Sequence, residues 1–236
     1  MTANRIEFGH GTHTGLRRDH NEDTYHADAD LGLWLVADGM GGHDYGEVAS
    51  ALAREYVVKE IAGGKALSTA IVTADQEIMR HSAERRSERP MGTTVVALTI
   101  KGADFEVAWV GDSRVYMYHG ELKQLSRDHS YVQELVDTGV LTPEQAKTSP
   151  HRNVVTQALG VTAPEQLRVE TVRGTLKAGM QFLLCSDGLT EEVDDKEIGE
   201  ILSRSLSAQE SVDHLILAAL DGGGSDNVTV LLLKCA

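Results

Sequence analysis

The sequence predicts an α+β fold in which sheets pack against each other and helices lie outside them. Two early segments repeat apolar residues at helical spacing, strand-like runs fill the middle, and a capped helix and an apolar strand close the chain. The 236 residues fit one domain of roughly 200–250 residues. We therefore expect residues 1–236 to form a single domain.

The first half contains two predicted strands and two predicted helices. We expect a short strand at residues 6–8 and an apolar strand at residues 31–37, which stops before Asp38. The helices follow, because apolar residues recur there at intervals of three and four. These residues are Ala49, Leu52, Ala53, Tyr56 and Val57 in one helix, and Leu67, Ala70, Ile71, Ala74 and Ile78 in the other.

Strands dominate the middle of the chain until residue 128. We expect strands at residues 93–100 and 105–110, then a hairpin of residues 115–118 and 121–125 around His119-Gly120. Residues 128–158 interrupt the pattern with short helices near 131–138 and from Thr142, where Pro143 is at the first helical position and Gln145 has the spacing of a capping box with Thr142. This segment is expected to form a small flap subdomain over the sheet.

The last part of the chain returns to strands. We expect them at residues 167–172, 181–185 and 228–234, with a helix that begins at the capping box of Ser207 and Glu210. Residues 221–225 are glycine-rich, and we expect a flexible approach to Asp226 there.

Charge and cysteine content exclude several classes of function. With 22 Lys and Arg against 36 Asp and Glu, the net charge is −14, so nucleic-acid binding is not expected. No apolar run reaches the roughly 18 residues of a membrane span, and the N-terminus lacks a signal-peptide pattern. Cys185 and Cys235 have no CxxC partner, which argues against a disulfide framework. We therefore expect a cytoplasmic location.

Acidic residues follow or precede apolar strands at several points. They are Asp38, Asp112, Asp187 and Asp226, together with the pair Glu22-Asp23. Carboxylates that converge at buried strand ends need cations, and all-oxygen ligands favour Mg²⁺ or Mn²⁺ over zinc. An Asp-Gly pair is also a common turn. The residues alone leave both interpretations open.

An ordered set of motifs spans residues 9–232. It comprises GLRRDHNED at 15–23, VADGMGGH at 36–43, GTT at 92–94, GDSR at 111–114, SDG at 186–188 and DN at 226–227. The set resembles the metal-dependent serine/threonine protein phosphatases of the PPM (type 2C) family, specifically their bacterial members. DHS at 128–130, RN at 152–153 and ALG at 158–160 are similar to family segments around a mobile flap.

The resemblance implies a four-layer α-β-β-α sandwich, with two antiparallel sheets face to face and helices on both outer faces. It also implies two core Mn²⁺ or Mg²⁺ ions. Asp38 would bridge them, Asp187 and Asp226 would complete the protein ligands of one ion, and the Gly39 carbonyl would serve the other.

Three further acids enter through the same resemblance. Glu22 and Asp23 would hold metal-bound waters, and Asp112 would help to form a third, weaker metal site. Arg18 lies five positions before Asp23, which is the spacing of the family's phosphate-binding arginine. Arg17 is off that register and is expected at the surface.

The chemistry of such a site would be direct hydrolysis. A hydroxide that bridges two metal ions attacks phosphorus in line, and Arg18 aligns the phosphate. The proton donor for the leaving group is less defined, because Met40 stands where eukaryotic relatives have a histidine. His43 is a candidate general acid, although it could instead shape the loop, and a metal-bound water is an alternative acid.

These implications predict a phosphoprotein phosphatase that acts on phosphoserine and phosphothreonine and opposes a bacterial Ser/Thr kinase. Its partners would be phosphorylated proteins, including that kinase, and we expect a monomer with no nucleic-acid or membrane partner. Two alternatives stay open: a phosphohydrolase of the same fold with another substrate class, and a non-catalytic phosphoprotein-binding module.

Overall fold

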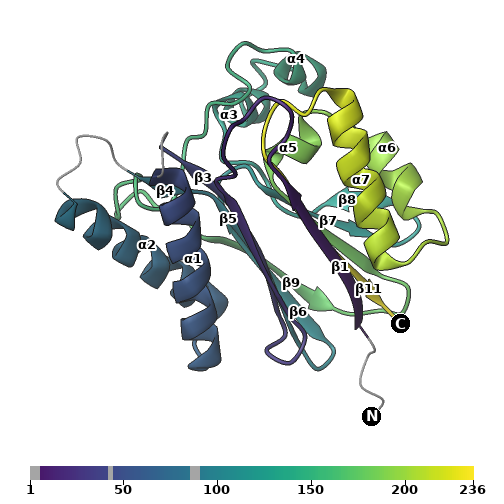
Figure 1. Cartoon of the computed structure of the whole chain (residues 1–236), viewed down its shortest axis with the longest axis horizontal. Helices are drawn as coiled ribbons and strands as arrows, with labels where there is room; N and C mark the ends of the chain where they lie inside the picture. The colour runs from purple at the N-terminus through teal and green to yellow at the C-terminus, as the bar shows by residue number, and fades with distance from the viewer. Residues whose placement is uncertain (1–5, 42–44, 86–90) are drawn as a thin grey trace.

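Two antiparallel sheets lie face to face at the centre of the molecule (Figure 1). The computed structural model describes residues 6–41, 45–85 and 91–236. The first sheet has the strand order β1 (Ile6–His13), β11 (Val228–Cys235), β10 (Gln181–Cys185), β7 (Arg114–Tyr118) and β8 (Leu122–Gln124). The second has the order β2 (Asp23–Asp28), β3 (Leu33–Met40), β5 (Val95–Lys101), β6 (Asp104–Val110) and β9 (Glu170–Thr175), with β4 (Gly92–Thr93) beside β3.

The apolar run in strand β3 is continuous because the strand packs against a core on each of its two faces. Leu33 and Leu35 belong to the core under the helices, whereas Trp34 and Val36 belong to the core between the two sheets. Both faces of the strand are therefore covered, and a strand of this kind has no polar side.

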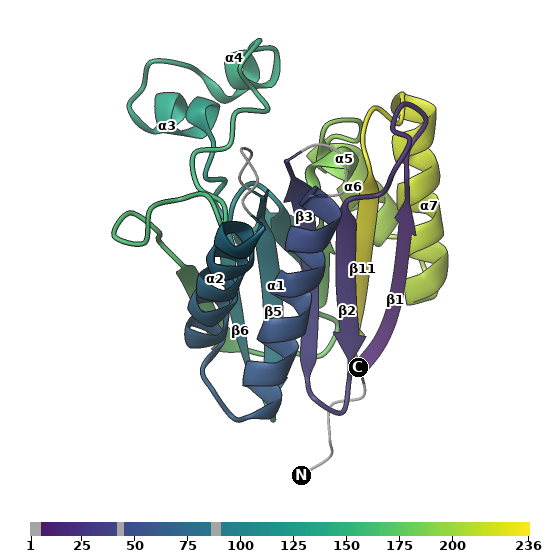
Figure 2. The same ribbon diagram turned by 60° about the vertical axis from the view of Figure 1, so that its left-hand side comes forward.

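Helices cover the outer face of each sheet (Figure 2). The second sheet is covered by α1 (Tyr45–Ala62) and α2 (Leu67–Glu84), and the first by α6 (Asp195–Leu202) and α7 (Ala208–Gly222). The expected four-layer α-β-β-α sandwich is thus confirmed. Across the described parts of the chain, no helix has the length and apolar character needed to cross a membrane.

Three short helices lie near one end of the sheets, toward the top of Figure 1. They are α3 (Tyr131–Asp137), α4 (Pro143–Lys147) and α5 (Asp187–Thr190). Helices α3 and α4 stand away from the sheets in both views (Figures 1 and 2). The capping box of Thr142 and Gln145 begins α4, and that of Ser207 and Glu210 begins α7, both as predicted.

Several strand limits differ from the predicted ones. Strand β3 does not stop at Ala37 but continues through Asp38 to Met40, because Asp38 pairs with β2 and the next two residues pair with β4. The strand expected at 93–100 is divided at Thr94 into β4 and β5. The backbone N–H of Thr94 donates to the Asp38 carbonyl at 2.8 Å. The strand expected at 167–172 lies at Glu170–Thr175, where it pairs with β6.

Candidate metal centre

The acidic residues predicted from the sequence meet at one edge of the two sheets. Asp23 lies directly opposite Asp38 in the β2–β3 ladder. Strand β10 ends just before Asp187, and its antiparallel neighbour β11 begins just after Asp226, so these two residues lie at the same edge. Asp112 follows the end of β6. The topology therefore brings together side chains that are far apart in the sequence.

Burial and mutual repulsion raise the pKa of these carboxyl groups. Burial is the main cause of the raised pKa of Asp38, followed by the charges of Asp23 and Asp187. The pKa of Asp187 also lies well above its ordinary range, because of burial and then of Asp112. Burial is the first cause for Asp23, whose pKa rises to about 6, and for Asp112, whose pKa rises to about 7. Such a group of acids favours bound protons or bound cations.

Two fully buried carboxylate oxygens of the group have no hydrogen-bond partner in the described structure. They are Oδ1 of Asp23 and Oδ1 of Asp187, both buried. Oδ2 of Asp23 accepts a hydrogen bond from the Ser186 hydroxyl at 2.8 Å. Unpartnered buried oxygens among crowded carboxylates fit an oxygen-ligated divalent cation such as Mg²⁺ or Mn²⁺.

The side chains as placed do not form a complete ligand cage. Within residues 6–41, 45–85 and 91–236, no three His, Cys, Asp or Glu side chains are arranged to hold one ion by themselves. Asp226 is engaged elsewhere, because its Oδ2 lies 2.5 Å from Nη2 of Arg18. A cation at Oδ2 of Asp226 therefore competes with this ion pair.

A pair of threonines holds Asp38 in position. The Asp38 backbone N–H donates to the Thr94 hydroxyl at 3.1 Å, and the Asp38 carbonyl accepts from the Thr93 hydroxyl at 2.8 Å. The Thr94 hydroxyl also lies 2.7 Å from the Ser113 hydroxyl, next to Asp112. We assigned no role to these residues from sequence. The GTT motif at 92–94 belonged to the ordered motif set, but it did not indicate that these side chains contact Asp38.

Glu22 and Gly39 meet the start of α1. The Gly39 N–H donates to the Glu22 carbonyl at 3.2 Å, and a Cβ on Gly39 would lie only 2.2 Å from the Gly46 carbonyl oxygen. Burial is the main cause of the raised pKa of Glu22, and the nearby Gly46 backbone N–H acts in the opposite direction. Glycine at both positions permits this close approach of strand and helix.

Of the remaining predicted residues, the structure describes Arg17, Arg18 and Met40 but not His43. Arg17 and Arg18 are both exposed, and Arg18 contacts Asp226. Met40 ends β3. His43 lies outside the described residues, so its role as general acid stays a prediction.

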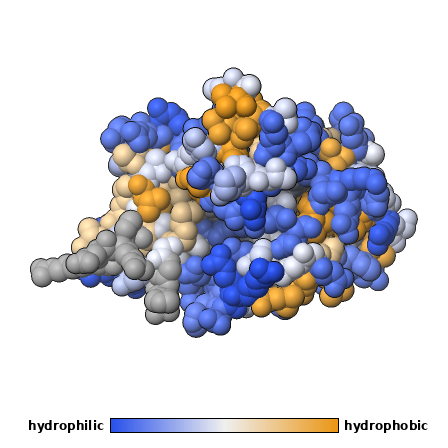
Figure 3. All heavy atoms as spheres, turned by 90° about the horizontal axis from the view of Figure 1, so that it is seen from above, coloured by the Kyte–Doolittle hydropathy of each residue, from blue (hydrophilic) through white to orange (hydrophobic). Residues whose placement is uncertain are grey.

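A cavity of about 500 Å³ lies between the flap and the acidic edge. Asp112 and Asp187 line one side, and Val132, Pro143 and Arg152 belong to the flap side. Hydrophilic residues dominate the centre of the face seen from above (Figure 3). The cavity offers room for a chain segment next to the acidic edge.

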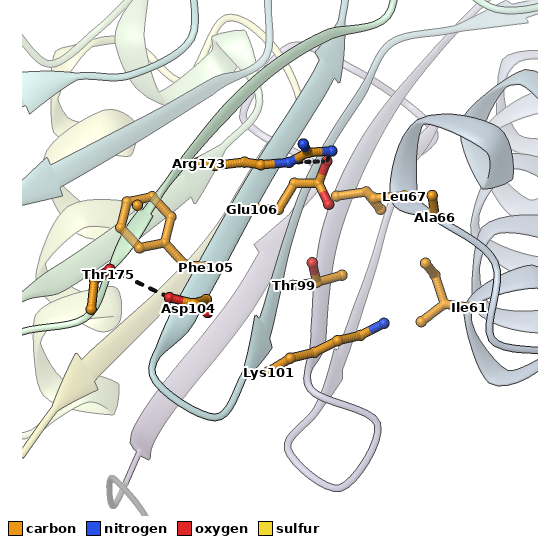
Figure 4. A pocket seen from close by; sticks show the side chains of 11 residues that line it. Ile61, Ala66, Leu67, Thr99, Lys101, Asp104, Phe105, Glu106, Arg173 and Thr175 are labelled. Atoms are coloured by element: carbon orange, nitrogen blue, oxygen red, sulfur yellow. Dashed lines mark hydrogen bonds and ion pairs between the residues drawn. The ribbon is translucent and has the colours of Figure 1, made fainter.

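A second cavity, of about 520 Å³, lies beside the second sheet, between the α1–α2 turn and strands β5, β6 and β9 (Figure 4). Arg173 donates to Glu106 there at 2.8 Å, and Thr175 donates to Asp104 at 3.3 Å. This cavity contains none of the predicted site residues.

Comparison with known proteins agrees with this arrangement. The sequence pattern of the family described as protein phosphatase 2C matches residues 11–217. The chain belongs to this family. The expected family, the PPM or type 2C phosphatases, is thereby confirmed, and so is the expected enzyme class of protein phosphatase.

Relatives within the protein phosphatase 2C family cover most of the chain. The serine/threonine phosphatase stp of Listeria monocytogenes is 36% identical over 241 residues, which are 94% of this chain and 93% of that protein. The serine/threonine protein phosphatase PstP of Mycobacterium tuberculosis is 41% identical over 225 residues, or 92% of this chain and 43% of PstP.

Solved structures of the family share the fold. The crystal structure of Mycobacterium tuberculosis PstP/Ppp superimposes with a TM-score of 0.90 at 36% identity, and covers 97% of this chain and 98% of that one. A PstP catalytic domain in complex with two manganese ions has a TM-score of 0.87 at 35% identity and full coverage of both chains.

Proposed function

We propose that this chain is a Mn²⁺- or Mg²⁺-dependent phosphatase that hydrolyses phosphoserine and phosphothreonine in proteins. The observation that supports this most strongly is the convergence of Asp23, Asp38, Asp187 and Asp226 at one edge of the sheets. The two manganese ions named for the PstP catalytic domain support the choice of cofactor.

Each residue of the edge has a proposed role. Asp38 would be shared by two ions, Asp187 and Asp226 would bind one of them, and the Gly39 carbonyl would bind the other. When bound, the ions would supply a water of lowered pKa and neutralise phosphate charge. Arg18 would bind two phosphate oxygens and orient the phosphoryl group for in-line attack.

The outer acids would support this centre. Glu22 and Asp23 would accept hydrogen bonds from water, and Asp112 would help to hold a third ion. His43 is a proposed proton donor to the leaving oxygen, with water as the alternative.

The direct test is hydrolysis by purified protein of para-nitrophenyl phosphate and a phosphothreonine peptide with Mn²⁺. We expect Asp38→Ala to abolish both activities and Asp30→Ala, an exposed control, to leave them intact. Metal-loaded protein that turns over neither substrate would contradict the proposal. Phosphopeptide binding without metal and without turnover would favour the binding-module alternative, and activity on small phosphates alone would favour another substrate class.

We further propose that residues 1–236 act as one catalytic domain, in which the flap at 128–158 tunes substrate access. The cavity between flap and acidic edge supports this role. The bridge between Ser130 and Val155 brings the flap ends together, so a short glycine link can replace residues 131–154. Unchanged selectivity of this variant across a phosphopeptide panel would contradict the proposal.

The physiological setting is proposed to be the bacterial cytoplasm, with a Ser/Thr kinase as the opposing enzyme. Two free, buried cysteines, Cys185 and Cys235, are compatible with a reducing compartment. Deleting this gene should increase phosphorylation at the same sites whose phosphorylation decreases when the kinase gene is deleted. Light scattering tests the expected monomer.

A further inference from the structure

The loop that carries Asp226 is folded around one acidic side chain, Glu192. Oε1 of Glu192 accepts two hydrogen bonds from Ser225, one from the backbone N–H at 3.0 Å and one from the hydroxyl at 2.5 Å. Ser225 directly precedes Asp226. Glu192 lies just beyond α5, the short helix that begins at Asp187. Glu192 thus links the two strand ends that supply Asp187 and Asp226.

Two glycines give Glu192 the space that it occupies. A Cβ on Gly222 would lie 2.9 Å from Cβ of Glu192, and one on Gly223 would lie 3.1 Å from its Oε2. Gly223 also has a φ of +145°, which an L side chain rarely adopts. The glycine-rich stretch therefore permits a close contact with Glu192.

The opposite side of the loop is held by the N-terminal segment. The Leu16 N–H donates to the Gly224 carbonyl at 2.7 Å, and the Asn227 side-chain amide donates to the Thr14 carbonyl at 2.9 Å. The approach to Asp226, expected to be flexible, is instead fixed on both sides. The direction in which the Asp226 side chain leaves the backbone depends on these contacts.

We propose that Glu192 is a positioning residue that aligns Asp226 for cation binding. It acts through Ser225 and contacts neither cation nor substrate in this role. Oε1 of Glu192 accepts hydrogen bonds from both the backbone N–H and the hydroxyl of Ser225, and these two bonds hold Ser225 in place. The inference rests on the proposed metal-dependent function, in which Asp226 is a ligand.

The test measures Mn²⁺ affinity by titration calorimetry with the metal alone and no substrate. Residues that orient metal ligands change metal affinity by roughly 10–100-fold, and we expect a loss in this range for Glu192→Ala. Glu192→Gln retains an acceptor oxygen and should stay within about threefold of the parent protein. Ser225→Ala keeps the backbone donor but loses the hydroxyl, so a roughly two- to tenfold loss is expected.

Turnover gives a second measurement. In Glu192→Ala, kcat should recover at saturating Mn²⁺, with KM for the phosphopeptide unchanged. Glu200→Ala, in the exposed part of α6, is the matched acidic control and should keep parental affinity. If Glu192→Ala does not fold, Ser225→Ala decides the question by the same titration.

Two outcomes would overturn the inference. One is parental Mn²⁺ affinity in Glu192→Ala, or in Ser225→Ala if that variant must decide. The other is a loss in Glu192→Gln as large as that in Glu192→Ala, which would mean that the charge rather than the acceptor geometry acts. Failure of the parent protein to bind Mn²⁺ would instead contradict the proposed function.

Discussion

Nη2 of Arg18 lies 2.5 Å from Oδ2 of Asp226, an ion pair between residues from opposite ends of the chain. The hydrogen bond to Asp226 is also the main cause of the raised pKa of Arg18. The first residue is the proposed phosphate ligand and the second a proposed metal ligand. The pair therefore connects the binding of substrate with the binding of metal.

We predict that Arg18→Ala separates these two properties. Inorganic phosphate should bind the metal-loaded variant at least roughly tenfold more weakly, because charge-assisted hydrogen bonds are lost. Mn²⁺ should bind more tightly, since Asp226 no longer contacts a competing cation. Calorimetric titrations with each ligand check both signs, and exposed Arg17→Ala should change neither. Weaker Mn²⁺ binding in Arg18→Ala would refute the competition.

The stability of the metal-free protein should fall as the pH rises from about 4 to about 7. The folded-state pKa is raised to about 6 for Asp23 and to about 7 for Asp112, against an ordinary value of 3.8. The folded state therefore binds more protons than the unfolded chain, and this stabilisation is lost as pH rises through the folded values.

Thermal unfolding in a chelator at pH 5 and pH 8 checks this dependence. Asp112→Asn removes one titrating group and should reduce the difference between the two pH values. Saturating Mn²⁺ should raise Tm more at pH 8 than at pH 5, because ionised carboxylates bind the cation. Equal stability of the chelated protein at both pH values would argue against the buried acidic cluster.

Breaking the ion pair of Arg114 and Asp128 should be strongly destabilising. Nη2 of Arg114 donates to Asp128 at 2.7 Å and Nη1 donates to the Tyr116 hydroxyl at 3.0 Å, while the Asp128 side chain is only 9% exposed. Removing one partner of a buried pair costs roughly 3 kcal/mol. Asp128→Asn should therefore lower Tm by about 6–12 °C.

A surface pair provides the control for that experiment. Arg173 and Glu106 are also 2.8 Å apart, but the arginine side chain is 71% exposed. Such pairs contribute about 1 kcal/mol or less, so Glu106→Gln should shift Tm by only a few degrees. Equal shifts for the two variants would contradict the role assigned to burial.

Gly39→Ala should damage the site, whereas Gly199→Ala should not. A Cβ at Gly39 would lie 2.2 Å from the Gly46 carbonyl oxygen, whereas one at Gly199 would lie 3.7 Å from its nearest neighbour, Cβ of Leu122. Overpacking costs roughly 1–3 kcal/mol, while alanine inside a helix gains about 0.5–1 kcal/mol over glycine. Urea unfolding and Mn²⁺ titration of both variants test this. A Gly39→Ala protein with parental stability would exclude the close contact.

The sequence was sufficient to predict the layers, and it named the acidic residues that the structure places at one edge of the sheets. Helical spacing located α1 and α2, because each buries one face on the second sheet, and the order of the motifs implied the two-sheet sandwich. It could not show that β3 continues to Met40, since Gly39 and Met40 pair with β4, more than fifty residues away in the chain. The contacts of Thr93 and Thr94 with Asp38 could not be predicted for the same reason.

Glu192 was hidden in a different way. It belongs to a run of acidic residues that leads into α6, and Asp194 in the same run caps that helix. Its contact with Ser225 joins residues 33 positions apart. No local pattern distinguishes such a carboxylate from its exposed neighbours.

The position of β11 constrains how the protein is made. This strand lies between β1 and β10, so the first sheet cannot close until residues 228–235 have left the ribosome. Asp226 emerges at the same stage of synthesis, so the acidic edge of the sheets is incomplete before then. Synthesis should thus yield no active enzyme before residues 226–235 have been made, and the long-range β1–β11 pairing should make folding slow.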